Sequence, residues 1–257
     1  MLRFENRVAL VTAAASGLGM GVALRLASEG GTAIIWDRDE AAMAATRDEA
    51  RQFGNRVEVH KVDMTSGQEI ETAVAALVEK HGRIDVLVNN IGGSLHTPFH
   101  LLDLTDEDWD RVMAVNVTAC VRVTRAVIPH MQRASYGRIV NMGSKAGRFG
   151  SLFTGANYVA AKGAMQAFTL QIAQEFGPLG ITCNTVAPGA ILTPRVERLL
   201  NERQSPEERA RVVASIPVRR QGTVSDIAAA IAYLASEEAG FVTGATLDVN
   251  GGQAMAI

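Results

Sequence analysis

Short apolar segments alternate with amphipathic segments along most of the chain. Residues 7–12 (R-V-A-L-V-T) and 32–37 (T-A-I-I-W-D) are rich in β-branched and other apolar residues, as buried parallel strands are. Between them, residues 22–31 have a helical pattern that ends at two glycines. Five more strands are predicted within residues 56–63, 85–93, 138–142, 181–187 and 246–250, with helices at about 40–53, 70–82, 106–133 (two helices), 157–173 and 226–236.

Strands and helices that alternate at this pace form βαβ units, in which helices cover both faces of a parallel sheet. The pattern therefore predicts an α/β fold: a single doubly wound Rossmann-type domain over residues 1–257, with a mostly parallel seven-stranded sheet. The polar segment 195–211 carries five Arg and four Glu, and it predicts a solvated helical insertion at about residues 193–217, on the substrate side. In such folds the ligand binds outside the carboxyl ends of the strands.

Composition excludes several classes of function. A net charge of −2 provides no positive surface for nucleic acid or an anionic membrane, so neither partner is expected. The two cysteines, without a C-x-x-C motif, argue against a disulfide framework and a zinc site, and His96 and His100 straddle a proline, so no metal is expected. No secretory signal is present, and no run reaches the ~18 apolar residues of a membrane span. These features predict a cytoplasmic protein.

The turn after the first strand has the glycines that a phosphate site needs. Gly17, Gly19 and Gly21 lie where strand becomes helix, which is the context in which backbone can approach a pyrophosphate at a helix N-terminus. Asp37 ends the second strand, where its carboxylate can accept hydrogen bonds from an adenosine ribose. It could instead cap the helix that follows.

Tyr158 and Lys162 are four residues apart on a predicted helix, so the phenol and the ammonium share one face. A tyrosine titrates near pH ~10, and a cation held nearby favours its phenolate. Ser144 follows an apolar run, where its hydroxyl could hydrogen-bond a reacting oxygen opposite the tyrosine. The alternative is a surface Tyr and Lys on an amphipathic helix.

The chain resembles the short-chain dehydrogenase/reductase family over essentially its full length. The matching segments are residues 12–19 (T-A-A-A-S-G-L-G), 62–63 (V-D), 89–92 (N-N-I-G) and 188–193 (P-G-A-I-L-T). The family's catalytic tetrad is matched by Asn116, Ser144, Tyr158 and Lys162.

The resemblance implies a role for each matching residue. Tyr158 exchanges the proton of the substrate hydroxyl, and Ser144 hydrogen-bonds the substrate oxygen. Lys162 lowers the pKa of Tyr158 and binds the nicotinamide ribose. Asn116 helps to hold a water chain behind Lys162. Asp63 and Met64 face the adenine, Asn90 the adenosine ribose, and Ile191 with Thr193 the carboxamide. With Tyr158 and Lys162, the full set expected to bind the cofactor is Ala13, Ser16, Gly17, Leu18, Gly19, Asp37, Arg38, Asp63, Met64, Asn90, Gly92, Pro188, Gly189, Ile191 and Thr193.

Two positions depart from the family pattern. Ala13 stands where the family has glycine, and Ile91 stands where it has alanine. We expect the turn to tolerate Ala13 because its backbone does not need a positive φ there. Ile91 adds bulk beside the cofactor or beneath it.

The predicted function is hydride transfer between NAD(H) and a secondary alcohol or ketone, cyclic, aryl or bearing an acidic group. Asp37 would repel the 2′-phosphate of NADP(H), and relatives that use NADP(H) have a basic residue where this chain has Ser16. The alternatives are an NADPH-dependent 3-oxoacyl-thioester reductase and a non-catalytic dinucleotide-sensing module. The substrate is expected to contact Ser94, His96, Lys145, Arg148, Phe149, Phe153 and Leu192, and a homotetramer is expected from the family and from the apolar helices around residues 117–127 and 161–172.

Overall fold

A computed structural model describes residues 2–193, 196–197 and 205–255 of the chain. Its centre is a seven-stranded sheet with the order β3-β2-β1-β4-β5-β6-β9, in which every neighbouring pair is parallel. The predicted fold class is therefore confirmed. The strands are β1 (Val8–Thr12), β2 (Thr32–Asp37), β3 (Val57–Lys61), β4 (Val86–Asn89), β5 (Gly137–Met142), β6 (Ile181–Pro188) and β9 (Thr246–Val249).

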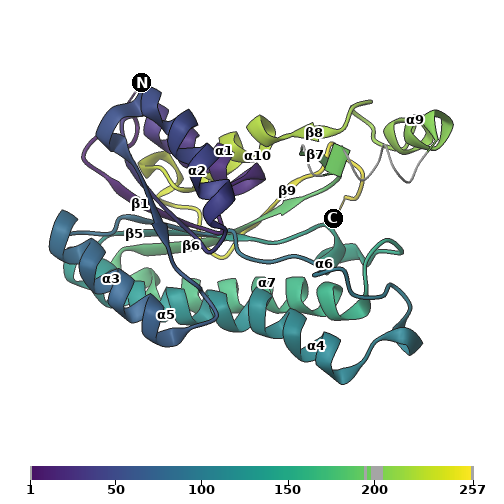
Figure 1. Ribbon diagram of the computed structural model, residues 1–257, viewed down its shortest axis with the longest axis horizontal. Coiled ribbons are helices and arrows are strands. Elements are labelled where there is room, and N and C mark those ends of the chain that lie inside the picture. The colour runs from purple at the N-terminus through teal and green to yellow at the C-terminus, as the bar shows by residue number, and fades with distance from the viewer. Residues whose placement is uncertain (1, 194–195, 198–204, 256–257) are drawn as a thin grey trace.

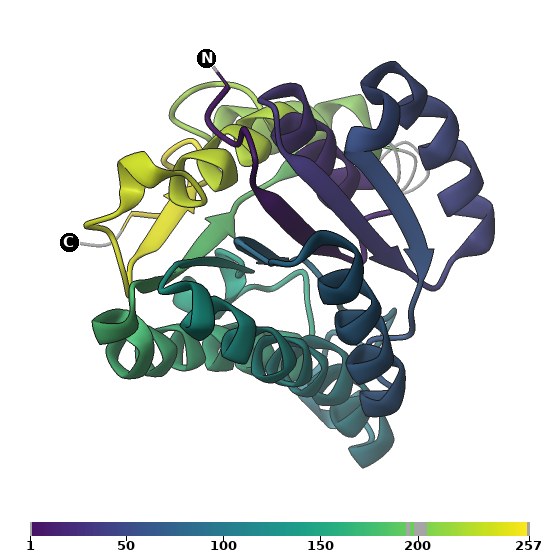
Figure 2. The same cartoon turned by 90° about the vertical axis from the view of Figure 1, so that its left-hand side faces the viewer.

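Helices cover both faces of this sheet (Figures 1 and 2). The upper layer in Figure 1 contains α1 (Gly17–Ser28), α2 (Glu40–Ala50) and α10 (Val224–Leu234). The lower layer contains α3 (Gly67–His81), α4 (Asp106–Met113), α5 (Ala119–Ala134) and α7 (Ala156–Phe176). Shorter elements connect them: α6 (Ala146–Phe149), the π-helix η3 (Ala114–Thr118), and the 3-10 helices η1 (Arg51–Arg56), η2 (Leu101–Asp103), η4 (Gly177–Leu179) and η5 (Glu237–Ala239).

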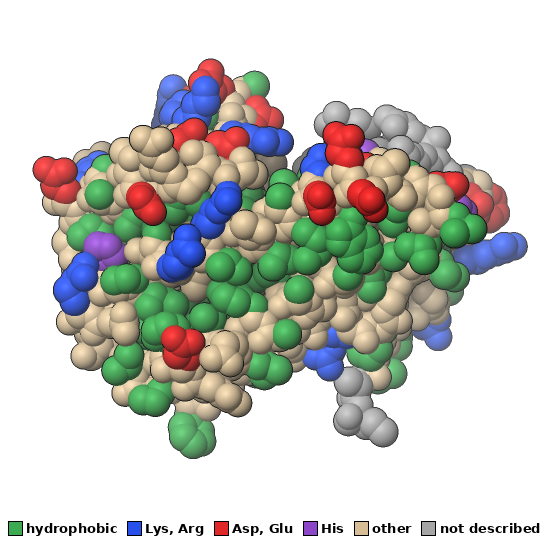
Figure 3. All heavy atoms as spheres, turned by 90° about the horizontal axis from the view of Figure 1, so that it is seen from below, with side chains coloured by type: hydrophobic (Ala, Val, Ile, Leu, Met, Phe, Trp, Pro, Cys, Tyr) green, Lys and Arg blue, Asp and Glu red, His purple; other side chains and the backbone are tan. Residues whose placement is uncertain are grey.

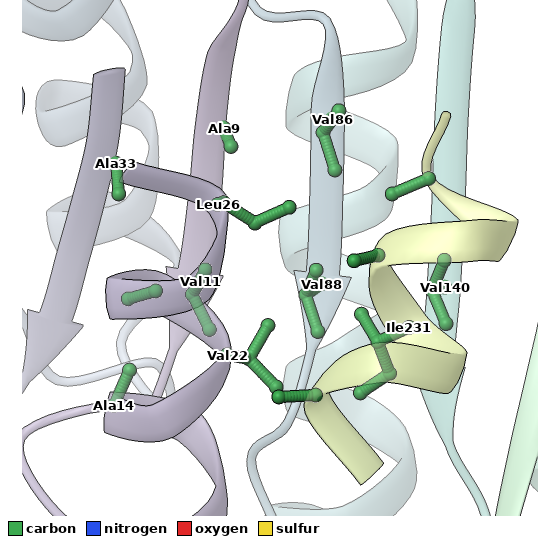
Figure 4. Close-up of a cluster of buried hydrophobic side chains, with 14 of the residues drawn as sticks. Ala9, Val11, Ala14, Val22, Leu26, Ala33, Val86, Val88, Val140 and Ile231 are labelled. Atoms are coloured by element: carbon green, nitrogen blue, oxygen red, sulfur yellow. The ribbon is translucent and has the colours of Figure 1, made fainter. Parts of the chain in front are cut away.

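The central strands are buried on both faces, which explains their continuous apolar sequence. Successive side chains of a strand point to opposite faces. Ala9 and Val11 of β1 therefore pack in the upper core with Val22 of α1 and Ile231 of α10 (Figure 4). Leu10, between them, packs in the lower core against residues of α3 and α5.

The helical stretch Asp106–Ala134 runs without a break through α4, the π-helix and α5. It is the one stretch in the described part of the chain that could cross a membrane by length and composition. Buried helices of soluble proteins pass the same test. Val123, Val127 and Met131 of α5 lie fully buried in the lower core, so packing within the fold accounts for the apolar character of this stretch.

The predicted insertion at residues 193–217 lies partly outside the described residues, which lack 194–195 and 198–204. Within it, α9 (Pro206–Ala214) follows the N-cap residue Ser205, whose side chain forms a capping box with Glu208. The two-stranded ribbon of β7 (Ile191–Leu192) and β8 (Gly222–Thr223) flanks the insertion. The helix predicted at 40–53 is shorter than expected, because it passes into η1 at Arg51.

Candidate active site

The glycine turn lies at the carboxyl end of β1 and is bonded to the end of β4. The Thr12 hydroxyl accepts hydrogen bonds from the backbone N–H groups of Asn90 (3.1 Å) and Ile91 (3.2 Å). The Asn90 amide donates to the carbonyl oxygens of Thr12 (3.1 Å) and Ala13 (2.8 Å). At Gly19 a Cβ atom would lie 2.5 Å from Asn90 Nδ2, so only glycine allows this close approach. Asn90, predicted to meet the adenosine ribose, uses its amide to fasten the turn.

Ala13 contradicts our expectation for the turn. Its φ is 49°, in the left-handed region that disfavours a residue with a Cβ atom. The turn therefore needs the positive φ that glycine adopts freely. The bond from the Asn90 amide to the Ala13 carbonyl holds this conformation.

The beginning of α1 offers room for a phosphate group. Ser16 is the N-cap residue, and its side chain makes no capping hydrogen bond. A Cβ atom built on Gly17 would meet no atom within 4 Å, so the space over the turn is open. Leu18 packs against the upper core. These residues fit a dinucleotide phosphate, because the unpaired N–H groups of a helix N-terminus attract anions.

The Asp37 carboxylate is held by three backbone N–H groups at the end of β2. Oδ2 accepts from Ala15 (3.0 Å), and Oδ1 accepts from Arg38 (2.7 Å) and Asp39 (3.0 Å). The alternative role as helix cap belongs to Asp39, which accepts from the N–H of Ala42 at the start of α2. Asp37 is therefore rigidly placed beside the glycine turn.

Next to Asp37, Arg38 lies 4.0 Å from the Asp63 carboxylate. Hydrogen bonds from Thr65 hold the pKa of the Asp63 carboxyl below its usual range. Arg38 also lines a cavity of about 470 Å³, with Thr65, Leu95, His96, Arg111, Ala114 and Val115. The Met64 side chain packs in the lower core, so only its backbone remains for a ligand. Ile91 packs in the same core.

Lys162 lies on α7, and its buried ammonium donates to the carbonyl of Met142 at the end of β5 (2.8 Å). Asn116 lies in the π-helix, where its amide exchanges two hydrogen bonds with the backbone of Gly93 (2.9 and 3.0 Å). A Cβ atom on Gly92 would lie 2.3 Å from Asn116 Oδ1 and 3.0 Å from Lys162 Nζ. The two side chains therefore meet at Gly92. Burial lowers the pKa of Lys162 to about 8.

Tyr158 lies one turn before Lys162 on α7, and Lys162 Nζ is 5.8 Å from the centre of its ring. Burial raises the pKa of the Tyr158 phenol, and a hydrogen bond with Ser144 opposes this rise. We expected Lys162 to lower this pKa. The pKa is raised instead, because the desolvation of the buried phenol is the largest contribution to its shift. A raised pKa keeps the phenol protonated at neutral pH, which suits a proton donor. Ser144 Oγ also accepts from the N–H of Ala146 (3.1 Å).

The turn after β6 closes the other side of the site. The Pro188 carbonyl accepts from the N–H of Lys145 (2.9 Å), and Gly189 donates to Val249 (3.1 Å). Ile191 is buried in the upper core. The Thr193 hydroxyl accepts from the N–H of Val196 (3.2 Å).

The residues predicted to contact substrate divide into two groups. Ser94 and His96 lie in the loop that follows Gly93, and the Ser94 carbonyl accepts two hydrogen bonds from Thr97. Phe149 and Phe153, in the segment before Tyr158, are 41% and 74% exposed.

Arg148 and Leu192 form the second group. Arg148 is turned toward β9, where it pairs with Asp248 (3.5 Å), and its charge is thereby compensated. Leu192 forms part of the β7–β8 ribbon.

Several residues at the site were not found from sequence. Thr65 fastens the turn after β3, and Val115 and Arg111 line the cavity near Arg38. Thr12 lies in the matching segment 12–19, but its role in fastening the turn after β1 was not predicted. The position of Val115 directly before Asn116 was a signal that could have found it. Within the described ranges, no three His, Cys, Asp or Glu side chains could together hold a metal ion.

The doubly wound sheet, with an open glycine turn at the carboxyl end of β1, defines a dinucleotide-binding protein. The family model described as Enoyl-(Acyl carrier protein) reductase matches residues 12–254. The chain is 41% identical over 253 residues to short-chain reductase protein NovJ of Streptomyces niveus, with 97% of this chain and 94% of the relative covered. It is 36% identical over 254 residues to 3-oxoacyl-(acyl-carrier-protein) reductase FabG of Vibrio cholerae, covering 99% and 100% of the two chains.

A solved structure of a short-chain type dehydrogenase/reductase from Mycobacterium ulcerans superposes with a TM-score of 0.91 at 30% identity, covering 97% of this chain and 90% of that one. The chain belongs to the short-chain dehydrogenase/reductase family, and it is an oxidoreductase.

Proposed function

We propose that the protein transfers hydride between NAD(H) and a secondary alcohol or ketone, with residues 1–257 acting as one dinucleotide-binding and catalytic domain. The observation that carries this proposal is the convergence of Lys162 and Asn116 at Gly92, with Tyr158 and Ser144 beside them. All four side chains lie at the carboxyl ends of the strands, at the same edge of the sheet as the glycine turn. A dinucleotide-sensing module would not need this set of proton-transfer groups.

Each residue has a task that its surroundings support. Ser144 donates a hydrogen bond to the carbonyl oxygen of the substrate, and the protonated Tyr158 gives its proton to that oxygen as hydride arrives on carbon. Lys162 has one donor on Met142, which leaves two for a ribose and a proton relay. Asn116 holds the Gly93 backbone in place beside Lys162. The nicotinamide, when bound, supplies the hydride chemistry.

The cofactor is proposed to be NAD(H), because the rigid Asp37 carboxylate lies where a 2′-phosphate would be repelled. The cavity beside Arg38 provides space for the adenosine. The names of the FabG relatives favour a second candidate, reduction of a 3-oxoacyl thioester. NADPH as reductant would have to bind despite the repulsion between its 2′-phosphate and the Asp37 carboxylate. A comparison of 3-oxoacyl thioesters with simple ketones, each with both cofactors, separates the two candidates.

The variant Tyr158→Phe tests the proposal directly. It should lose a factor of ~10² to 10⁴ in kcat, as expected for loss of general acid catalysis, while NADH binding measured by fluorescence changes little. Tyr136→Phe is a matched control, because Tyr136 stacks with Arg7 and Arg138 far from the site. A Tyr158→Phe variant that keeps a tenth or more of the activity would show that Tyr158 has another role.

The quaternary structure is proposed to be a homotetramer. Hydrophobic side chains gather along the middle of the lower face (Figure 3), which α5 and α7 form in Figure 1. Leu170 of α7 is 53% exposed. Light scattering at micromolar concentration should give four times the mass of the chain, and a monomer mass would refute the proposal. A cytoplasmic location stays a prediction.

A further inference from the structure

Two lysines at the catalytic end of the site have no acidic partner. Lys162 donates to a neutral carbonyl, and Lys145 follows Ser144 directly in the chain. Over the ranges that the structure describes, neither ammonium forms an ion pair. Nearby, Arg148 is neutralised by Asp248. The surroundings of Ser144 therefore carry positive charge that forms no ion pair with a carboxylate in the described part of the chain.

The backbone at Lys145 is firmly anchored in the site. Its N–H donates to the Pro188 carbonyl (2.9 Å), and the N–H of the next residue, Ala146, donates to Ser144 Oγ (3.1 Å). Lys145 is thus held between Ser144 and the turn after β6, which are two of the segments that surround the reacting group in the proposed function. Its flexible four-carbon stem allows the ammonium to reach a group beside Ser144.

The other lysines of the chain have acceptors. Lys61 pairs with Glu40 (2.6 Å), Lys80 pairs with Glu58 (2.8 Å), and Lys162 has the Met142 carbonyl. Lys145 is half-buried and, among the described residues, has no side-chain partner.

We infer that Lys145 binds an anionic group of the substrate. The substrate is then a ketone or secondary alcohol that carries a carboxylate or a phosphate near its reacting carbon. This inference rests on the proposed function, and it narrows the substrate class of the same site. Lysine suits this task because its compact charge attracts either anion without requiring a bidentate geometry.

The test compares anionic substrates with neutral counterparts of the same skeleton. The pairs are 3-oxobutanoate, 4-oxopentanoate and phenylglyoxylate, each against its ethyl ester, and dihydroxyacetone phosphate against dihydroxyacetone. Wild type should show a kcat/KM for at least one anion about 10- to 100-fold above its neutral counterpart, as expected for a hydrogen bond to a charged group. The carboxylate and phosphate arms show which anion is used. Added salt should reduce this ratio.

The variant Lys145→Met should bring the ratio close to one, because the KM for the anion should rise by a larger factor than the KM for the neutral substrate. Lys145→Arg should restore part of the preference. Lys80→Met is the matched control and should leave the ratio unchanged, because Lys80 pairs with Glu58 on the surface.

Equal kcat/KM values within every pair, or equal losses for both members in Lys145→Met, would overturn the inference. If neutral ketones are still reduced in a Tyr158-dependent manner, the proposed function survives that result. If no pair is turned over at all, the proposed function and this inference fail together.

Discussion

Replacement of Asp37 by asparagine should change the choice between NAD and NADP. Three backbone N–H groups hold the Asp37 carboxylate at 2.7–3.0 Å, so it cannot easily turn away from a ligand at the end of β2. Two unit charges 4 Å apart repel each other by about 4 kcal/mol at an effective dielectric of 20. Solvent reduces this value, but even ~2.7 kcal/mol corresponds to a hundredfold difference in binding. Wild type should therefore prefer NAD by about a hundredfold.

Asp37→Asn removes the charge and keeps the shape of the side chain. One acceptor oxygen is lost, which weakens the contact with Ala15 for both cofactors alike. The ratio of kcat/KM for NAD to that for NADP isolates the charge effect, and it should fall at least ~10-fold.

Asp39→Asn is the control, because Asp39 caps α2 and should affect stability but not this ratio. Arg38 is 67% exposed and 4.0 Å from Asp63, so it is a weak attractant for phosphate. Wild type that uses both cofactors equally well, or a folded Asp37→Asn variant with an unchanged ratio, would refute the reasoning.

Two further predictions concern stability. Ala13→Gly should raise the free energy of unfolding by ~0.5–1 kcal/mol, since relief of the left-handed strain at φ 49° exceeds the entropy cost of glycine. Denaturant titration measures this free energy, and Ala14→Gly is a control that should be destabilised. A lower free energy of unfolding in Ala13→Gly than in wild type would contradict the prediction. Lys162→Met should abolish activity yet raise Tm at pH 7, because burial lowers the pKa of Lys162 to about 8 from its ordinary 10.5. Between these pH values the unfolded chain binds more protons than the folded chain, so wild type gains stability as pH rises through this window. The difference in Tm between Lys162→Met and wild type should therefore shrink. A difference that stays constant with pH would show that the buried charge is not its cause.

The sequence by itself determined the fold class and the positions along the chain of the groups that we propose to be catalytic. Apolar runs of strand length alternate with helical patterns, and this local periodicity is enough to predict a parallel sheet. The i,i+4 spacing of Tyr158 and Lys162 and the glycines after β1 depend on neighbours in sequence. Such features can be predicted from sequence because the helix and strand periods fix which neighbouring side chains point in the same direction.

Only the tertiary structure decided how distant groups act on one another. It showed that the amide of Asn90 fastens the glycine turn 77 residues away in sequence, and that Ala13 takes a positive φ. It also paired Arg148 with Asp248, whereas Lys145, beside Ser144 in the chain, forms no ion pair with any residue that the structure describes. Burial overturned the expected direction of the Tyr158 pKa. These outcomes depend on strand register and on desolvation, which arise from contacts between segments far apart in the chain, and a linear pattern does not encode either quantity.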